Sequence, residues 1–139
     1  MEEIEVPTEH LHEEIQERAE EKKEKWTLYV ALSTAFMAVL AAVAGLLAYL
    51  YRSAVRDQWL SLLPVSAQDG TLHARFAGTL AAGRIRAKTG SLSHVSTLSG
   101  YAQRGSGQML AFSILVNNYH GPAADLTAAI DRVCELMVE

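Results

Sequence analysis

Residues 83–90 read GRIRAKTG, and they begin the part of the chain that decides the fold. Ile85 and Ala87 alternate with charged side chains, a pattern typical of a β-strand with one buried face. A second run with strand character, Val95–Gln103, follows after a short serine-containing loop. The sequence therefore predicts that Arg84–Gly90 and Val95–Gln103 form an antiparallel pair.

A third strand and a helix follow this pair. Met109–Asn117 is continuously apolar, as expected of a strand that is covered on both faces. Pro122 can start a helix. Beyond it, apolar side chains recur every three to four residues, which predicts one buried helix face; they are Leu126, Ile130, Val133 and Met137. The expected fold class is α+β, a three-stranded antiparallel sheet with a C-terminal helix packed on it.

Short local signals lie upstream of the sheet. Trp59–Pro64 begins as an apolar segment of helical character that the proline ends. Residues 69–71 read DGT, which is a turn signal. We expect a short helix over Leu72–Phe76, directly after this turn.

The run Trp26–Tyr51 contains no charged residue. As a helix it is about 39 Å long, enough to cross a hydrocarbon core of about 30 Å with some tilt. Aromatic residues near both ends suit the two membrane interfaces. We expect a single transmembrane helix. One alternative is a buried helix of a soluble protein, but a domain this small can hardly cover such a helix. The other is a signal peptide, but the apolar region of a signal peptide is usually shorter.

Charge is divided unevenly along the chain. Residues 1–25 hold ten acidic and four basic side chains and read as a charged helix from Glu9, whereas residues 52–139 hold six acidic and eight basic ones. Four lysines and arginines precede the apolar run closely, and two follow it. This imbalance favours a cytoplasmic N-terminus and an outer C-terminal domain. The expected division is an acidic tail (1–25), a membrane helix (26–51) and a folded domain (52–139).

Several classes of function are disfavoured by composition. The chain has no basic stripe that would form a nucleic-acid footprint. Cys134 is the single cysteine, so it cannot form a disulfide within the chain. Gly105-Ser106-Gly107 lacks the following residues of a phosphate loop. We expect no metal ion and no cofactor.

Lys88-Thr89-Gly90 ends the first strand, and serine enzymes that recognise penicillin place a Lys-Thr-Gly triplet on the strand beside the active site. The chain from about Val55 onward resembles the C-terminal end of the D-alanyl-D-alanine carboxypeptidases of the penicillin-binding-protein-4 type (peptidase family S13). The resemblance rests on five segments in the same order: LPV at 63–65, DGTL at 69–72, GRIRAKTG at 83–90, VSTLSGY at 95–101 and LAFSILVNN at 110–118. Residues 1–53 are instead similar to an uncharacterised family of small bacterial membrane proteins.

The first resemblance implies a fold and a set of roles. The fold would be a partial penicillin-binding transpeptidase-like domain. Its strand edge would offer backbone hydrogen bonds to an extended peptide stem of peptidoglycan, or to a β-lactam. Lys88 would supply positive charge near the substrate carboxylate, Thr89 would hydrogen-bond that carboxylate, and Gly90 would leave room for close approach. Ser91 stands where the family more often has threonine and would line the same site.

The nucleophile of that family has no counterpart in the sequence. The family's Ser-x-x-Lys and Ser-x-Asn motifs do not occur, and we therefore assign no catalytic residue. One hypothesis is a truncated, membrane-tethered recognition part of a peptidoglycan carboxypeptidase or endopeptidase, which binds substrate weakly and non-covalently and is completed by a second polypeptide. The alternative is a non-catalytic single-span protein that binds peptide stems or a partner. Both place the chain in a bacterial inner membrane, in contact with lipid, with the domain in the periplasm.

Overall fold

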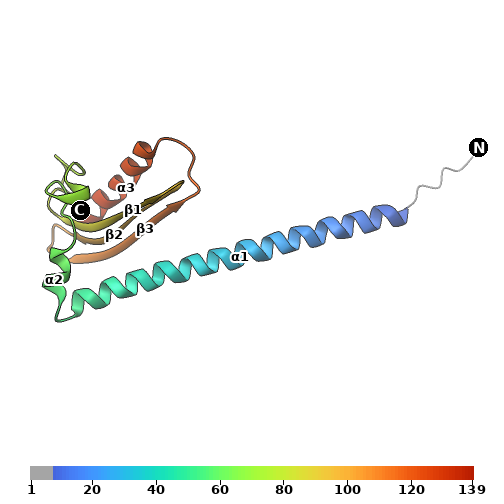
Figure 1. Cartoon of the computed structure of the whole chain (residues 1–139), viewed down its shortest axis with the longest axis horizontal. Coiled ribbons are helices and arrows are strands. Elements are labelled where there is room, and N and C mark those ends of the chain that lie inside the picture. The colour runs from blue at the N-terminus through green and yellow to red at the C-terminus, as the bar shows by residue number, and fades with distance from the viewer. Residues whose placement is uncertain (1–7) are drawn as a thin grey trace, which may run out of the picture. The chain divides into compact units, whose positions relative to one another are not determined.

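The computed structural model describes residues 8–139, with side chains described from His12 onward (Figure 1). The chain divides into two compact units, one that ends at Val39 and one that begins at Leu40. The elements, in chain order, are α1 (Thr8–Arg52), α2 (Arg56–Ser61), a 3-10 turn η1 (Gly70–Leu72), β1 (Ile85–Leu92), β2 (Val95–Gln103), β3 (Met109–Asn117) and α3 (Ala123–Val138). The first seven residues of the expected acidic tail lie outside the described part.

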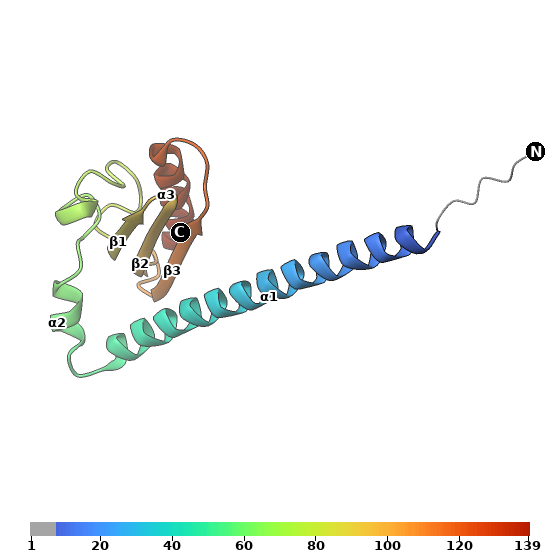
Figure 2. The same cartoon turned by 45° about the vertical axis from the view of Figure 1, so that its right-hand side comes forward.

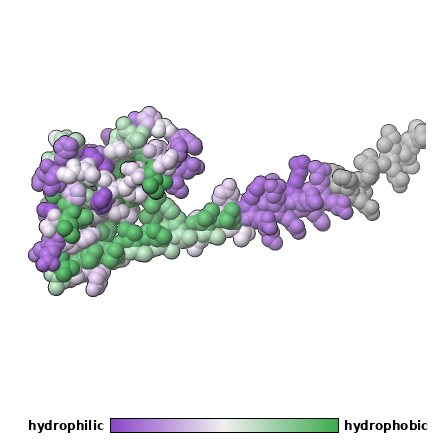
Figure 3. Space-filling model, viewed as in Figure 1, coloured by the Kyte–Doolittle hydropathy of each residue, from purple (hydrophilic) through white to green (hydrophobic). Residues whose placement is uncertain are grey.

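The charged helix and the apolar helix expected from the sequence form one continuous helix, α1. Its charged half carries two exposed ion pairs between side chains four residues apart. Arg18 contacts Glu14 at 3.0 Å, and Lys25 contacts Glu21 at 2.7 Å. Such exposed pairs contribute little to stability. Figure 3 shows the change from hydrophilic to hydrophobic side chains along α1. Among the described residues, α1 is a helix long and apolar enough to cross a membrane, with a mean hydropathy of 2.3 over its most apolar window.

The three strands form an antiparallel sheet in the order β1-β2-β3 (Figure 2). Lys88 pairs with Ser99, and Ser99 pairs with Ser113. Because paired residues share a face of the sheet, this row defines one face, which we call the lysine face. The opposite face carries Leu98 and Phe112, and α3 packs against it. We call it the α3 face.

The main core lies on the α3 face and joins the sheet to α3 and to the loop before β1. Its buried side chains are Leu72, Phe76, Ala81, Ile85, Ala87, Leu98, Ala102, Phe112, Ile130, Cys134 and Val138. The predicted α3 stripe is right at Leu126, Ile130 and Met137 but wrong at Val133, which is 46% exposed. Cys134 occupies the core instead, because it lies four residues after Ile130 and four before Val138, on one side of the helix.

A second, smaller core covers one end of the lysine face. Leu47 near the end of α1, Leu63 and Tyr101 are buried together, and Trp59 packs against them. The Tyr101 hydroxyl donates to the Leu47 carbonyl at 2.6 Å and accepts from the Trp59 indole N–H at 2.9 Å. The last turns of α1, from Leu40, therefore belong to the same compact unit as the sheet.

The structure corrects three local expectations. Of the helix expected over Leu72–Phe76, only Leu72 is helical, as the last residue of η1; backbone hydrogen bonds from the Ala67 amide to Leu72 and Arg75 hold the following loop, and Phe76 has a φ of 67°. Ser91 lies in β1 rather than in the loop, since β1 extends to Leu92 and turns over two residues. The apolar strand β3 is not covered throughout on both faces, because only Phe112 is buried, while Ala111 and Asn117 are exposed.

Candidate functional site at the outer edge of β1

The outer edge of β1 is half occupied and half open. At its start, the Ser66 amide donates to the Ile85 carbonyl at 2.9 Å, and the Ala87 amide donates to the Pro64 carbonyl at 3.1 Å. Backbone groups on a strand alternate in direction, so the N–H and C=O of Thr89 and Ser91 point outward on the same edge. Within residues 8–139, no other strand pairs with this second half. It is therefore free to bind an extended backbone.

Lys88 lies beside this open edge with its side chain exposed. Its ammonium donates to the carbonyl of Thr89 at 2.7 Å, which is one of the outward-pointing groups. A peptide strand that added to the edge would bring its own N–H to that carbonyl. The lysine would then be released to pair with an anionic group of the ligand.

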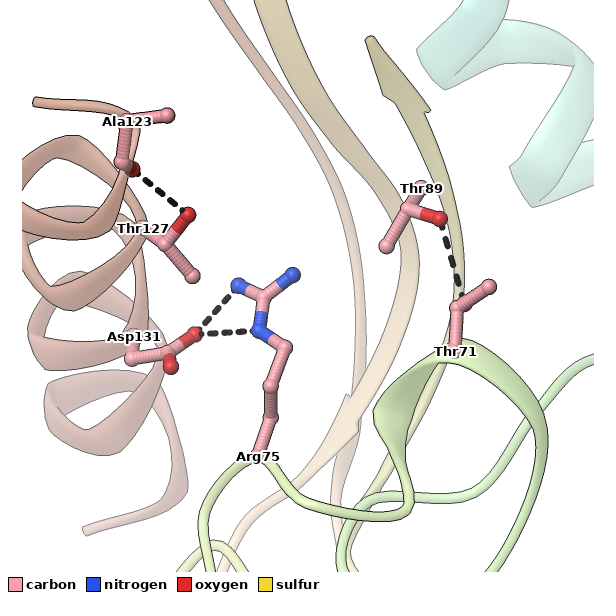
Figure 4. Close-up of polar contacts among 6 residues, drawn as sticks. All are labelled: Thr71, Arg75, Thr89, Ala123, Thr127 and Asp131. Carbon is pink, nitrogen blue, oxygen red and sulfur yellow. Dashed lines mark hydrogen bonds and ion pairs between the residues drawn. The ribbon is translucent and has the colours of Figure 1, made fainter.

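Thr89 projects toward the α3 face, opposite to Lys88, as the strand alternation predicts. Its hydroxyl donates to the Thr71 hydroxyl at 3.1 Å (Figure 4). A ligand that contacts both Lys88 and the Thr89 hydroxyl must therefore lie along the edge of the sheet, where both faces can be reached. Thr71 comes from η1, and sequence reasoning did not identify it as a site residue.

The loop that carries Thr71 is tied to α3 by an ion pair. The Arg75 guanidinium contacts Asp131 through two nitrogens, with Nε at 3.0 Å from the carboxylate oxygen (Figure 4). Both side chains are less than one-fifth exposed. Asp69 caps the same loop by accepting from the Val65 amide at 2.6 Å. These bonds hold Thr71 beside β1. The ion pair could not be predicted from a local sequence motif, because Arg75 and Asp131 lie 56 residues apart in the chain.

Gly90 and Ser91 complete the predicted set. A Cβ atom built on Gly90 would lie 2.5 Å from the Thr97 hydroxyl, so a side chain at this position would displace the neighbouring strand's threonine. Because Gly90 has no side chain, nothing projects from the lysine face at this position next to the edge. Ser91 is exposed and pairs with Ser96. The four predicted residues therefore lie together along the open half of β1.

No nucleophile and base come together in the part of the chain that the structure describes. Ser99 lies across from Lys88, but its hydroxyl shares a hydrogen bond with Ser113 at 2.8 Å, while the Lys88 ammonium is bonded to Thr89. Ser66 is buried and bonds backbone groups of the core. Burial raises the pKa of the Cys134 thiol to about 12, which disfavours the reactive thiolate. Covalent catalysis needs a nucleophile within hydrogen-bond reach of its base.

The side chains that usually bind metal ions in proteins are those of His, Cys, Asp and Glu. Among the described residues, no three His, Cys, Asp or Glu side chains gather in a way that would hold a metal ion. The β1 edge offers a ligand backbone hydrogen bonds, one cation and hydroxyl groups.

Comparison with known proteins identifies relatives of the chain. The chain is 47% identical over 70 residues to a D-alanyl-D-alanine carboxypeptidase of Actinomadura sp. (strain R39), covering 47% of this chain and 13% of that protein. It is 42% identical over 83 residues to carboxypeptidase DacB of Mycolicibacterium smegmatis, covering 54% and 18% respectively. The chain thus spans less than one-fifth of the length of these relatives.

Solved structures agree at the level of the fold. Penicillin-binding protein 4 of Haemophilus influenzae matches 69% of this chain with a TM-score of 0.63 at 22% identity, over 23% of its own length. A second structure of that protein, in complex with a β-lactam, matches 68% of this chain with a TM-score of 0.61 at 23% identity, over 24% of its own length. The α+β arrangement expected from the sequence is confirmed.

The family match begins earlier in the chain than the resemblance described above. It covers residues 32–136, so it starts inside the apolar run rather than near Val55. This agrees with the packing of the last turns of α1 against the sheet. The match covers most of the chain, and the chain belongs to the D-Ala-D-Ala carboxypeptidase 3 (S13) family.

Proposed function

We propose that this chain is a substrate-recognition part of a serine-type D-Ala-D-Ala carboxypeptidase or endopeptidase that acts on peptidoglycan. The observation that carries the proposal is the open half of β1, where outward backbone groups of Thr89 and Ser91 stand next to Lys88. Family membership supplies the class of ligand, a peptide stem that ends in D-Ala-D-Ala, or a β-lactam that resembles it.

In this proposal the ligand adds to β1 as an extra strand. Its backbone bonds the edge at Thr89 and Ser91, and its carboxylate pairs with Lys88. The Thr89 hydroxyl turns from Thr71 to the same carboxylate. Gly90 allows the ligand to approach closely, since a side chain there would collide with Thr97.

Binding at this edge is non-covalent and weak in the chain by itself. The sequence contains neither Ser-x-x-Lys nor Ser-x-Asn. Acylation by a β-lactam needs an activated serine, so positioning by Lys88 and Thr89 forms no covalent bond. We propose that a second polypeptide that carries these motifs completes the site.

A second candidate is a purely binding role. The pairing of Ser99 with Ser113, rather than with Lys88, favours it, because the hydroxyls on the lysine face are engaged with one another. In this case the chain is a single-span membrane protein whose domain holds peptide stems without hydrolysing them.

We also propose that α1 anchors the chain in a bacterial inner membrane, with the N-terminus in the cytoplasm and the domain in the periplasm. The uncharged run Trp26–Tyr51 supports insertion. The excess of lysine and arginine before this run supports the orientation.

The test uses the full-length chain in detergent micelles. Binding of an N-acylated D-Ala-D-Ala peptide is measured by titration, and covalent labelling by a fluorescent penicillin is read on a denaturing gel. Lys88→Ala should weaken peptide binding several-fold, because it removes the charge partner of the carboxylate. Arg104→Ala is the matched control, since Arg104 is an exposed cation away from the edge.

The outcomes separate the candidates. No gel labelling with the chain alone, and labelling only after a polypeptide with the two missing motifs is added, supports the completed enzyme. Peptide binding with no labelling even after such a polypeptide is added supports the binding role. Absence of peptide binding, or equal loss in both variants, contradicts recognition at β1.

A further inference from the structure

The end of α1 has two apolar sides with different surroundings. One side faces the sheet: Leu47 is only 6% exposed, and Val43 and Tyr51 pack against the same small core as Tyr101. The other side is bare: Leu46 is 56% exposed and Tyr49 is 69% exposed. Both sides lie on the same turns of one helix.

The bare side continues upstream without interruption. Leu32, Val39 and Leu46 follow one another at steps of seven residues, which is nearly two helical turns, so they share one side of α1. Leu32 and Val39 are 59% and 57% exposed. No charged residue occurs between Trp26 and Tyr51. The helix upstream of the turns that hold the sheet is therefore apolar and exposed, as the bare side of those turns is.

Helix length decides what the bare side of these turns contacts. Only fourteen residues, Trp26–Val39, precede the turns that belong to the domain's compact unit. Fourteen helical residues span about 21 Å, which is too short for a hydrocarbon core of about 30 Å. A membrane span therefore has to include turns of α1 that also pack against the sheet.

We propose that the bare side of Leu40–Arg52 lies in the phospholipid bilayer while the opposite side of the same turns holds the sheet. This inference rests on the proposed membrane span of α1. The domain would then rest directly on the membrane surface instead of standing away from it on a linker. Tyr49 and Arg52, which are both exposed, supply an aromatic and a basic group that favour the interface.

The proposal also fixes where recognition takes place. Tyr101, which is bonded to α1, pairs with Arg86, and Lys88 lies two residues further along β1. Two residues of a strand extend about 7 Å. The candidate edge would therefore bind its ligand close to the membrane surface.

The experiment places an environment-sensitive fluorophore on single introduced cysteines in the full-length chain, reconstituted into phosphatidylcholine–phosphatidylglycerol vesicles. Labels at Leu46→Cys and Tyr49→Cys probe the bare side. Ala35→Cys reports insertion of the upstream helix, and Gln103→Cys is an exposed position on the domain. The wild-type chain, whose Cys134 is buried, sets the background. Emission is measured with doxyl-labelled lipid and with aqueous iodide.

The expected result is a loss of emission with doxyl lipid at positions 46 and 49, as at position 35, with shielding from iodide. Position 103 should respond to iodide instead. If position 35 is lipid-quenched but 46 and 49 are quenched by iodide, the docking proposal is wrong while the span survives. If neither quencher lowers the emission at positions 46 and 49, a protein covers the bare side of α1, and the proposal is also overturned. Iodide quenching at position 35 as well would refute the membrane span itself.

Discussion

The hydroxyl of Tyr101 joins the end of α1 to the sheet, and removing it gives a direct measure of that junction. In Tyr101→Phe the ring stays in place, and two hydrogen bonds are lost: the one donated to Leu47 and the one accepted from Trp59. The Trp59 N–H then has no protein partner. Leaving a buried donor unsatisfied costs about 1–3 kcal/mol. Because Trp59 is only partly buried, we expect the unfolding free energy to fall by about 1–2 kcal/mol, within that range.

The assay is urea unfolding of the full-length chain in detergent, followed by the accessibility of the Cys134 thiol. Tyr51→Phe is the matched control: it makes the same chemical change at a ring only 5.5 Å from that of Tyr101. No hydrogen bond of the Tyr51 hydroxyl occurs in the described structure, so this change should stay within about 0.5 kcal/mol. Equal small effects of the two variants would refute the claim that the Tyr101 hydroxyl fastens α1 to the sheet.

Three further predictions follow from the fold and the site. Gly100→Ala should destabilise the domain by about 1–3 kcal/mol in the same urea assay, since the new methyl group would lie 2.6 Å from the Ala87 Cα atom; an unchanged midpoint would contradict the strand pairing. Burial raises the pKa of the Cys134 thiol to about 12 in the folded state, whereas the pKa of the unfolded thiol is about 9. Stability should therefore fall between these values as pH rises, more steeply in the wild type than in Cys134→Ala; parallel pH profiles would contradict burial of the thiol. Thr71→Val removes the hydroxyl that accepts from Thr89, so it should change the affinity for a D-Ala-D-Ala peptide without lowering the urea midpoint appreciably. A large loss of stability would show that the Thr71–Thr89 hydrogen bond is structural.

Much of the sheet was predictable from local pattern. Val95–Gln103 and Met109–Asn117 have the bounds that the sequence indicates, because the glycine-rich turn between them separates two apolar runs clearly. The end of β1 was placed too early, since the serines that follow Gly90 are as common in loops as in edge strands. On α3, the 3.6-residue period allows either Val133 or Cys134 to continue the stripe, and only packing against the sheet selects Cys134.

The role of α1 was the least accessible to sequence reasoning. In a uniformly apolar run, composition does not indicate which side packs against protein, so Leu47 and Leu46 look equivalent although one is buried and the other bare. The division into residues 1–25, 26–51 and 52–139 stays a prediction, while the compact unit of the structure begins at Leu40. For the site, strand alternation placed Lys88 and Thr89 on opposite faces correctly. The Thr71 contact depends on a loop fixed by Arg75 and Asp131, which lie 56 residues apart.

The central claim is that the open half of β1 binds a peptide stem as an added strand. The most direct measurement is amide hydrogen exchange, resolved by residue, in the full-length chain with and without an N-acylated D-Ala-D-Ala peptide. The outward amides of Thr89 and Ser91 should gain protection when the peptide is added, while those of Ala111 and Ser113 on the other edge of the sheet stay unchanged. Unchanged exchange at Thr89 and Ser91 under saturating peptide, or protection confined to β3, would contradict recognition at β1.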